Sequence, residues 1–304
     1  MSLYHKYRPN NFDEVVGNAE TIEALQTYLK NKATCPHAFL LSGQTGCGKT
    51  TIGRIIAKEL DCSDNDLREV NTANFRGIDT VREIIQQSQF KPLEGDCRVW
   101  IIDECHKLTS DAQNALLKIL EDTPKHVYFV LCTTDPQKLI EAIKGRCTTF
   151  QMKPLNENQM INLLRRVIKA ENQMIQKLVY DQIIQDSLGM PRNALQILDQ
   201  VLQVESEKRL EIAKRSAEQQ SESIELCRLL VKSGTGWKQV ADVLSRLKDQ
   251  EPESIRRHVL GYCQAILLKE KNDNAARIIE AFYDSFFYIG YPGLVYACYT
   301  IINA

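Results

Sequence analysis

The chain has 304 residues, of which 43% are hydrophobic, 25% charged and 7% aromatic. This is ordinary globular composition, and it excludes collagen-like, disordered and disulfide-scaffold proteins. The 38 basic and 39 acidic side chains give a net charge of −1, so bulk charge does not indicate a nucleic-acid module and any such binding must come from a local patch. The length predicts two or three domains.

The ten cysteines are never spaced as a CxxC pair, so the spacing of a zinc ribbon is absent from the sequence. Their apolar surroundings are typical of free thiols in a reducing compartment. The polar, basic first ten residues predict no signal peptide. The uncharged stretch 285–304 is broken by Gly290, Pro292 and Gly293, and we expect a buried or interfacial helix pair there rather than a membrane span.

Residues 1–150 alternate short apolar runs with helical patterns, which predicts an α/β domain with a parallel sheet. The predicted strands are residues 38–42, 98–102 and 127–132. Helical periodicity begins at Lys49, and a second helix follows Ser110, which forms the capping-box pattern with Gln113.

The strand signal ends after Lys153 and Pro154. Residues 155–205 predict a small helical unit, and the chain from about 206 is again helical with breaks at 233–236 and near Asn272.

The glycine-rich segment 43–50 matches the phosphate-binding pattern G-x-x-x-x-G-K-[ST], with a predicted strand before it and a helix after it. Its backbone N–H groups and the helix N-terminus favour an anion, Lys49 would reach the β- and γ-phosphates, and Thr50 would offer its hydroxyl to Mg²⁺. The alternative is a chance glycine-rich turn. The residues that we expect to bind a nucleotide here are Gly43, Gln44, Thr45, Gly46, Cys47, Gly48, Lys49, Thr50 and Thr51.

Asp103 and Glu104 end the second predicted strand, where an Asp can hold Mg²⁺ and an adjacent Glu can orient the attacking water. The alternative is a solvated acidic loop. Cys105 and His106 follow, but an adjacent pair cannot assemble a tetrahedral metal site by itself, so we expect packing or surface residues.

Three single polar residues have both a functional and a plain interpretation. Thr134 follows the third predicted strand and either senses the γ-phosphate or forms a turn with Asp135. Arg146 follows a short helix and is either functional or a surface arginine at a helix C-terminus. Arg192 opens a predicted helix over 193–201 and is either functional or a solvated charge.

Together these residues resemble the clamp-loader branch of the AAA+ ATPases, especially bacterial subunits of the gamma/tau type. The resemblance is dense over residues 1–200 and beyond them rests on order and position. Gly145-Arg146-Cys147 stands where the family has Ser-Arg-Cys, so the glycine departs from the pattern while the arginine is retained. The other segments that carry the resemblance are 4–9 (YHKYRP), 12–17 (FDEVVG), 103–108 (DECHKL), 114–118 (NALLK), 133–139 (TTDPQKL) and 189–192 (GMPR).

The resemblance implies a fold of three parts. Residues 1–153 would form the α/β AAA+ P-loop ATPase domain, 154–205 a helical lid, and 206–304 an all-helical collar through which subunits assemble. Two departures are informative. The chain runs almost directly from Cys62 into the next strand, without the zinc module of the bacterial subunits. It also ends where the collar should end, without their long tail, as in the small subunits of archaeal, eukaryotic and phage loaders.

The resemblance also implies roles for single residues. Lys49, Asp103, Glu104 and Arg146 would be catalytic, with Arg146 acting on a neighbouring subunit's nucleotide. Further nucleotide contacts would come from Tyr7, Arg8, Pro9 and Val16 around the adenine, from Thr134, and from Arg192 in the lid. Arg82 matches a position that contacts DNA phosphates, and Arg76 lies near one proposed to restrain the Walker B glutamate. Both have the alternative of an exposed helix-surface arginine.

The expected function is that of a DNA-stimulated ATPase in a clamp loader, with ATP and Mg²⁺ as cofactors and no zinc. ATP binding between subunits would open a sliding clamp, and primer–template DNA would trigger hydrolysis and clamp release. The expected partners are the clamp, DNA, copies of this chain and other loader subunits, in the cytoplasm (that of the host if phage-encoded) and without a membrane. The alternatives are another AAA+ motor, such as a branch-migration helicase or helicase loader, and a scaffold that binds nucleotide without hydrolysing it.

Overall fold

A computed structural model of the chain describes residues 1–31, 34–72, 75–213, 222–250, 252–268, 271–286 and 288–303. The chain folds into two compact units. We call His5–Gln159 the sheet unit, and Met1–Tyr4 together with Met160–Ala304 the helical unit. The expected division into three domains, with boundaries after residues 153 and 205, stays a prediction.

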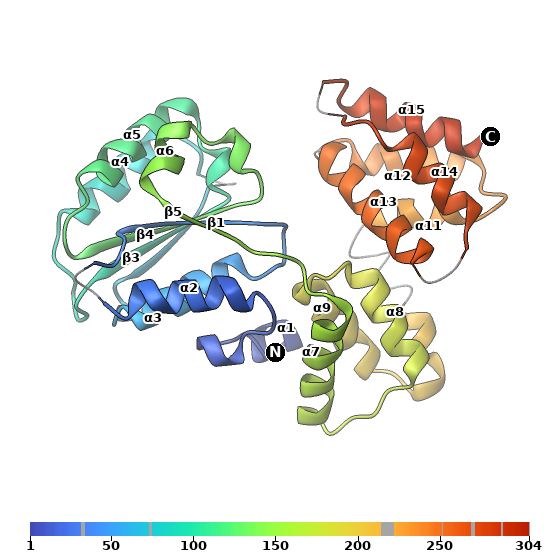
Figure 1. The fold of residues 1–304 in the computed structure, drawn as a ribbon, viewed down its shortest axis with the longest axis horizontal. Helices are drawn as coiled ribbons and strands as arrows, with labels where there is room; N and C mark the ends of the chain where they lie inside the picture. Colours follow the sequence, from blue (N-terminus) through green and yellow to red (C-terminus); the bar gives the residue numbers. More distant parts are fainter. Residues whose placement is uncertain are drawn as a thin grey trace. The chain divides into compact units, whose positions relative to one another are not determined.

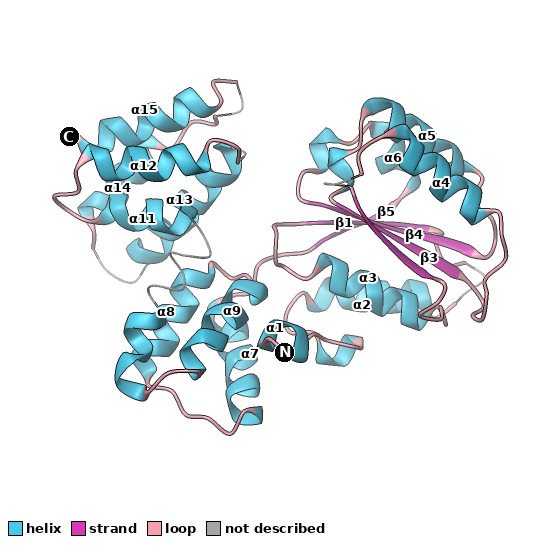
Figure 2. Ribbon diagram, turned by 180° about the vertical axis from the view of Figure 1, so that it is seen from behind, coloured by secondary structure: helices cyan, strands magenta, loops and turns pink. Residues whose placement is uncertain are grey.

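The sheet unit is built on five parallel strands, drawn in magenta in Figure 2. The predicted α/β class with a parallel sheet is therefore confirmed. Two of the predicted strands extend one residue further than expected, and no range was predicted for the strands at 67–71 and 148–151. In spatial order the strands are β2 (Leu67–Asn71), β3 (Arg98–Asp103), β4 (Val127–Thr133), β1 (Ala38–Ser42) and β5 (Thr148–Gln151).

Helices cover both faces of this sheet (Figure 1). One face carries α2 (Ala19–Leu29) and α3 (Lys49–Glu59), and the other carries α4 (Ile78–Ser88), α5 (Ser110–Glu121) and α6 (Glu141–Arg146). The shorter elements are α1 (Leu3–Lys6) and the 3-10 turns η1 (Phe12–Glu14), η2 (Cys105–Lys107) and η3 (Pro136–Lys138).

Side chains of the central strands alternate between the two helical layers, because successive residues of a strand point to opposite faces. Ile102 of β3 packs in the cluster that contains Leu116 of α5 and Ile143 of α6. Its neighbour Ile101 faces α3, where a Cβ added to Gly53 would lie 3.2 Å from the Cδ1 of Ile101. Burial on both faces explains why these strands are continuous apolar runs in the sequence.

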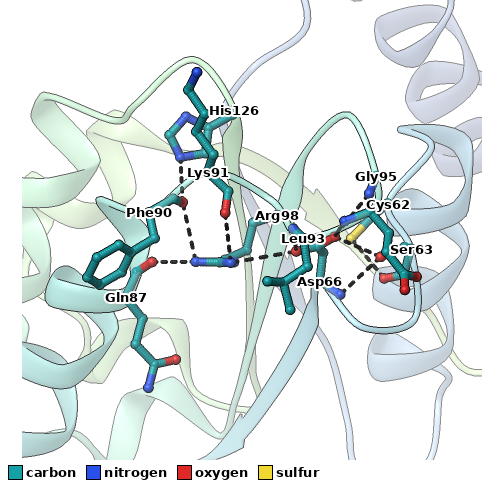
Figure 3. A network of polar contacts seen from close by, with 11 residues as sticks. Cys62, Ser63, Asp66, Gln87, Phe90, Lys91, Leu93, Gly95, Arg98 and His126 are labelled. Atoms are coloured by element: carbon teal, nitrogen blue, oxygen red, sulfur yellow. Dashed lines mark hydrogen bonds and ion pairs between the residues drawn. The ribbon is translucent and has the colours of Figure 1, made fainter.

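A buried ion pair fixes the amino ends of β2 and β3 (Figure 3). The carboxylate of Asp66 accepts hydrogen bonds from the backbone N–H groups of Leu93, Glu94 and Gly95, and lies 3.6 Å from the guanidinium of Arg98. Burial raises the pKa of Asp66, but these hydrogen bonds outweigh it and hold the pKa well below its usual range. The same guanidinium donates to backbone carbonyls at and just beyond the end of α4.

The start of α5 corrects one expectation. The cap residue is Thr109, whose Oγ1 accepts a hydrogen bond from the N–H of Ala112 at 3.3 Å, while Ser110 is the first residue of the helix. Gln113 does not complete a capping box. Its side chain donates to the carbonyl of Leu108 at 3.1 Å instead. Threonine and serine are both good caps, so the sequence alone could not decide between the two adjacent positions.

The helical unit contains no strand among its described residues. Its helices are α7 (Glu157–Ala170, which begins in the sheet unit), α8 (Lys177–Ser187), α9 (Pro191–Leu202), α11 (Glu222–Val231), α12 (Trp237–Leu247), α13 (Pro252–Leu267), α14 (Asp273–Ala281) and α15 (Tyr291–Ile302), with one 3-10 turn, η4 (Ser206–Lys208). An ion pair between Arg228 of α11 and the buried Asp186 of α8 joins two of these helices.

Two expectations for the helical unit need correction. The helix at Arg192 begins earlier than predicted, at Pro191, because proline is well suited to the first turn, where its missing N–H has no partner to lose. The uncharged tail forms one helix, α15, in the described part of 285–304, instead of a pair. Within the described ranges, every helix is too short or too polar to cross a bilayer.

Candidate nucleotide site

The phosphate-binding loop follows β1, which lies between β4 and β5 in the sheet. Its glycines at 43, 46 and 48 have φ values of 149°, 83° and 101°, which side chains rarely adopt. At Gly43 space is also lacking, since an added Cβ would lie 2.4 Å from the carbonyl oxygen of Met152. Cys47 is buried, and its N–H donates to the carbonyl of Gln44, while Thr45 is exposed at the loop tip.

Lys49 is buried, with 5% of its surface exposed, at the start of α3. Its Nζ donates to the carbonyl oxygens of Gly43 at 2.8 Å and Gln44 at 3.0 Å. The ammonium group is therefore already oriented over the loop, held by two neutral acceptors. A phosphate oxygen carries negative charge and is a stronger acceptor than a carbonyl, so it can replace them.

Thr50 and Asp103 bring the two halves of the predicted site together, although they are 53 residues apart. The Oγ1 of Thr50 donates to Oδ2 of Asp103 at 2.9 Å. The other carboxylate oxygen of Asp103 accepts the N–H of Glu104 at 3.0 Å. A hydroxyl and a carboxylate oxygen that meet at the end of a strand are the hard ligands that Mg²⁺ prefers, so these residues fit the expected metal.

Glu104 has a left-handed backbone conformation, with φ 54° and ψ 36°. For a residue other than glycine this costs on the order of 1–3 kcal/mol and has to be stabilised by its surroundings. The buried Thr72 provides that support, because its hydroxyl lies 2.6 Å from the carbonyl oxygen of Glu104 and 3.0 Å from that of Asp103.

His106 was expected to be a packing or surface residue, and it is largely buried, with two polar contacts that the sequence did not indicate. Its Nδ1 lies 3.1 Å from Oγ1 of Thr133, and its Nε2 lies 3.4 Å from Oε2 of Glu104. Only 8% of the imidazole side chain is exposed. Cys105, in contrast, is a core residue, and burial raises the pKa of its thiol above the usual range.

Two further polar residues escaped the sequence analysis. Thr72 follows β2 directly, and a hydroxyl at the carboxyl end of a strand was the available signal. Gln113 also donates to the carbonyl of Lys138 at 3.3 Å, and its Oε1 accepts the N–H of Ile140 at 3.0 Å. It thus ties the start of α5 to the segment between β4 and α6, and no local pattern indicates such a contact.

The opening segment contacts the phosphate-loop helix, α3, through hydrogen bonds from both sides. The Nε of Arg8 donates to Oγ1 of Thr51 at 3.0 Å. Tyr7, Pro9 and Val16 are partly buried in the same unit, and their role around an adenine stays a prediction. Thr134 is partly buried directly after β4, the strand that pairs with both β1 and β3, so it lies at the same sheet edge as the loop and Asp103.

Arg146 is the last residue of α6, on the face of the sheet opposite to α3 (Figure 1). Its guanidinium forms an ion pair with Glu121 at the end of α5, and its side chain is 40% exposed. Exposed pairs of this kind contribute about 0–1 kcal/mol, so a stronger anion can displace Glu121. The structure does not bring Arg146 together with the loop of its own chain.

The remaining predicted residues have partners of their own. Arg192 belongs to the helical unit, where Nη2 donates to the hydroxyl of Tyr4 at 3.0 Å and the guanidinium stacks 4.9 Å from the centre of that ring. Arg82 is exposed on α4 and pairs with Asp79 at 3.0 Å. Arg76 is exposed just before α4, and its carbonyl accepts the N–H of Thr109 at 3.1 Å.

All ten cysteines are free thiols. Among the residues that the structure describes, no group of three or more His, Cys, Asp and Glu side chains is placed to hold a metal ion.

The sequence matches proteins of bacterial DNA polymerase III. Residues 65–156 match the family model of the DNA polymerase III delta subunit. The gamma/tau subunit of Mycobacterium tuberculosis is 34% identical over 225 residues, which cover 66% of this chain and 39% of that protein. The gamma subunit of Buchnera aphidicola is 31% identical over 221 residues, 66% of this chain and 61% of that protein. The chain thus spans less than two thirds of either relative.

Among solved structures, the RuvB Holliday junction branch migration motor of Thermotoga maritima superposes with a TM-score of 0.61 over 79% of this chain and 85% of that one. The two are 19% identical, so this likeness concerns the fold alone. The chain therefore has the expected fold, a parallel α/β domain followed by a helical C-terminal region, and its resemblance to DNA polymerase III subunits of the gamma/tau type is confirmed.

Proposed function

We propose that this chain is an ATPase subunit of a sliding-clamp loader. The observation that carries the proposal is the hydrogen bond between Thr50 and Asp103, which joins the phosphate-binding loop to the strand end that bears Glu104. Its second support is the similarity to DNA polymerase III gamma/tau subunits.

In this proposal the chain's own residues have separate tasks. Lys49 binds the terminal phosphates in place of its present carbonyl acceptors. Thr50 and Asp103 hold Mg²⁺, which supplies charge neutralisation at the phosphates when it is bound. Glu104 orients the attacking water and takes its proton. Thr134 senses the γ-phosphate at the same sheet edge.

Arg146 completes the site of a neighbouring copy. Its position on the face opposite to α3 supports an action in trans, as does the weak, exposed pair with Glu121 that holds it in the single chain. A guanidinium near the transferring phosphoryl group neutralises the charge that develops there. We place the adenine against Tyr7, Arg8, Pro9 and Val16.

The remaining parts of the proposal concern assembly and DNA. Residues 154–205 act as the lid, with Arg192 as its nucleotide contact, and 206–304 act as the collar that assembles the subunits. Arg82 and Arg76 contact DNA phosphates. Such local contacts do not require a large positive net charge on the chain. In this proposal the chain acts in the cytoplasm, with the clamp, primer–template DNA and other loader subunits as its partners.

The test is steady-state ATP hydrolysis by the full chain, alone and with primed DNA and the cognate clamp. The proposal predicts activity that rises when DNA and clamp are both present. Stimulation by branched or duplex DNA without any effect of the clamp would favour another AAA+ motor. ATP binding without turnover under every condition would favour a nucleotide-binding scaffold.

A further inference from the structure

His106 bridges two strand ends of the candidate site. It lies in η2, three residues after Asp103 at the end of β3, and its Nδ1 reaches Thr133 at the end of β4. Its Nε2 lies 3.4 Å from the carboxylate of Glu104. The ring is almost fully covered, so water competes little for either nitrogen.

The partners of the ring decide where its proton lies. The 3.4 Å separation of Nε2 from Glu104 is longer than a typical N–H···O hydrogen bond, and because a carboxylate only accepts, we place the ring hydrogen on the nitrogen that faces it. In a neutral imidazole the other nitrogen is then an acceptor. Thr133 can serve it, because its oxygen accepts the N–H of Asp135 at 3.0 Å and its own hydrogen can then point at Nδ1, 3.1 Å away. The result is a relay from Asp135 N–H through Thr133 O–H to Nδ1, and from Nε2–H to Glu104.

The surroundings favour this neutral ring. Burial lowers the pKa of His106, and the nearby positive charges of Lys138 and Lys107 lower it further. The carboxylates of Glu104 and Asp135 act in the opposite direction but do not outweigh burial. At neutral pH the imidazole is therefore neutral rather than a second charge in the site.

We propose that His106 is a positioning residue, whose Nε2–H orients the Glu104 carboxylate for its work on the attacking water. This inference rests on the proposed ATPase function. Glu104 has a left-handed backbone conformation, which is strained for a residue other than glycine. A donor fixed at His106 Nε2 restricts its side chain to one rotamer instead of several. Thr133 directly precedes Thr134, the predicted γ-phosphate sensor. The relay therefore also links that sensor to Glu104, the predicted base.

The first test compares three full-length variants. His106→Phe keeps a ring but has no donor, and we expect kcat to fall by about 10-fold or more while ATP affinity stays unchanged. His106→Gln can place an amide N–H near the position of Nε2 and should recover most of the lost kcat. His126→Gln is the control, because that ring contacts the carbonyl of Phe90, and its kcat should equal that of the wild type.

The second test does not depend on activity. Long-range ¹H–¹⁵N spectra of the wild-type chain, with the His106 signals assigned by their loss in His106→Gln, report which ring nitrogen is protonated. We expect the Nε2–H form at pH 7.5. The Nδ1–H form would overturn the inference, since that ring could not donate to Glu104.

The kinetic outcomes separate the two proposals. If the wild type hydrolyses ATP and His106→Phe does so at the same rate, the role of His106 is wrong while the ATPase proposal stands. If His106→Phe and His106→Gln fall equally while both melt at the wild-type temperature, donation to Glu104 is likewise wrong. A wild-type chain without any ATPase activity would overturn the proposed function, and this inference with it.

Discussion

The two units bury polar side chains in different ways. In the sheet unit, the buried Lys49, Thr72 and Thr133 lie at the carboxyl edge of the strands. Their hydrogen-bond partners are carbonyl oxygens and a ring nitrogen of the loops at that edge. In the helical unit, buried charges such as Asp186 and Glu253 tie helices and loops together. We therefore expect buried polar side chains to serve chemistry at the sheet edge and to stabilise the fold in the helical unit.

The contrast has a physical origin. Parallel strands end together at one edge, so residues far apart in sequence meet there with backbone groups that no ladder satisfies. Helices satisfy their own backbone internally, so a buried charge between them has only side chains and helix ends as partners. Changes at the sheet edge should alter chemistry at constant stability, and changes in the helical unit should do the reverse.

The largest effect is expected at Glu104. Glu104→Gln keeps the shape of the side chain and loses the base, so kcat should fall by about 10²–10⁴-fold while ATP still binds. Single-turnover hydrolysis and equilibrium binding of a fluorescent ATP analogue measure the two quantities. The control is Glu121→Gln, which also removes a carboxylate from the sheet unit and should retain far more activity. Turnover of Glu104→Gln at the wild-type rate would show that Glu104 is not the base.

Asp66 tests the contrast from within the sheet unit, because this buried acid lies away from the carboxyl edge. Asp66→Asn leaves Arg98 buried without its counter-charge, and we expect the free energy of unfolding to fall by about 3–5 kcal/mol. Denaturant unfolding at pH 7 measures it, with the exposed Asp64→Asn as the control. An unchanged midpoint for Asp66→Asn would contradict the assigned role.

The same pair sets a pH dependence. The pKa of Asp66 is lower in the folded chain than its value of about 3.9 in an unfolded one. The stability from Asp66 is therefore fully present above pH 4 and is lost as the pH falls through the folded-state pKa. Unfolding curves of the wild type and Asp66→Asn should differ by a constant amount from pH 7 to about pH 4, and the difference should narrow as the pH falls further. A difference that does not narrow below pH 4 would be inconsistent with the lowered pKa.

Lys49 should change affinity rather than fold. Lys49→Ala removes a charged donor to the phosphates, so ATP should bind about 10- to 100-fold more weakly. Calorimetric titration measures the dissociation constant. Lys58→Ala, on the same helix but exposed, is the matched control and should bind like the wild type. Equal affinities for both variants would remove the loop from the site.

The smallest effect is expected in the helical unit. Tyr291 donates a hydrogen bond to the carbonyl of Leu244, which joins α15 to α12. Tyr291→Phe should lower the free energy of unfolding by about 0.5–1.5 kcal/mol and leave kcat unchanged. Thermal melting with Tyr283→Phe as an exposed control measures the difference. A lowered kcat with unchanged stability would contradict the expectation that changes in the helical unit alter stability and not chemistry.

Much of the sheet unit could be predicted, because its signals are local. The apolar run 38–42, the glycines of the loop and the periodicity from Lys49 each depend on neighbouring residues, and the structure has these elements where the sequence indicates them. The joining of Thr50 to Asp103 could also be anticipated, since parallel strands place their carboxyl ends at one edge.

What the sequence analysis missed depends on contacts across the chain. His106 meets Thr133, which is 27 residues away, and Gln113 meets Ile140 at the same separation. No periodicity or spacing encodes such pairs. The short strand β5 escaped prediction because its four residues alternate in burial with only Phe150 fully covered. The tail differs because Gly290 and Pro292, taken as a break between two helices, stand at the cap and in the first turn of one helix, α15.

The central claim is that two chains complete one ATP site, with Lys49 from one and Arg146 from its neighbour. The most direct measurement is ATP hydrolysis by a mixture of Lys49→Ala and Arg146→Ala chains, with primed DNA and clamp, after co-assembly is verified by analytical ultracentrifugation. Each variant alone should be inactive. The account predicts that the mixture regains activity, at interfaces where an intact Lys49 faces an intact Arg146. An inactive mixture despite co-assembly, or full activity of Arg146→Ala alone, would contradict it.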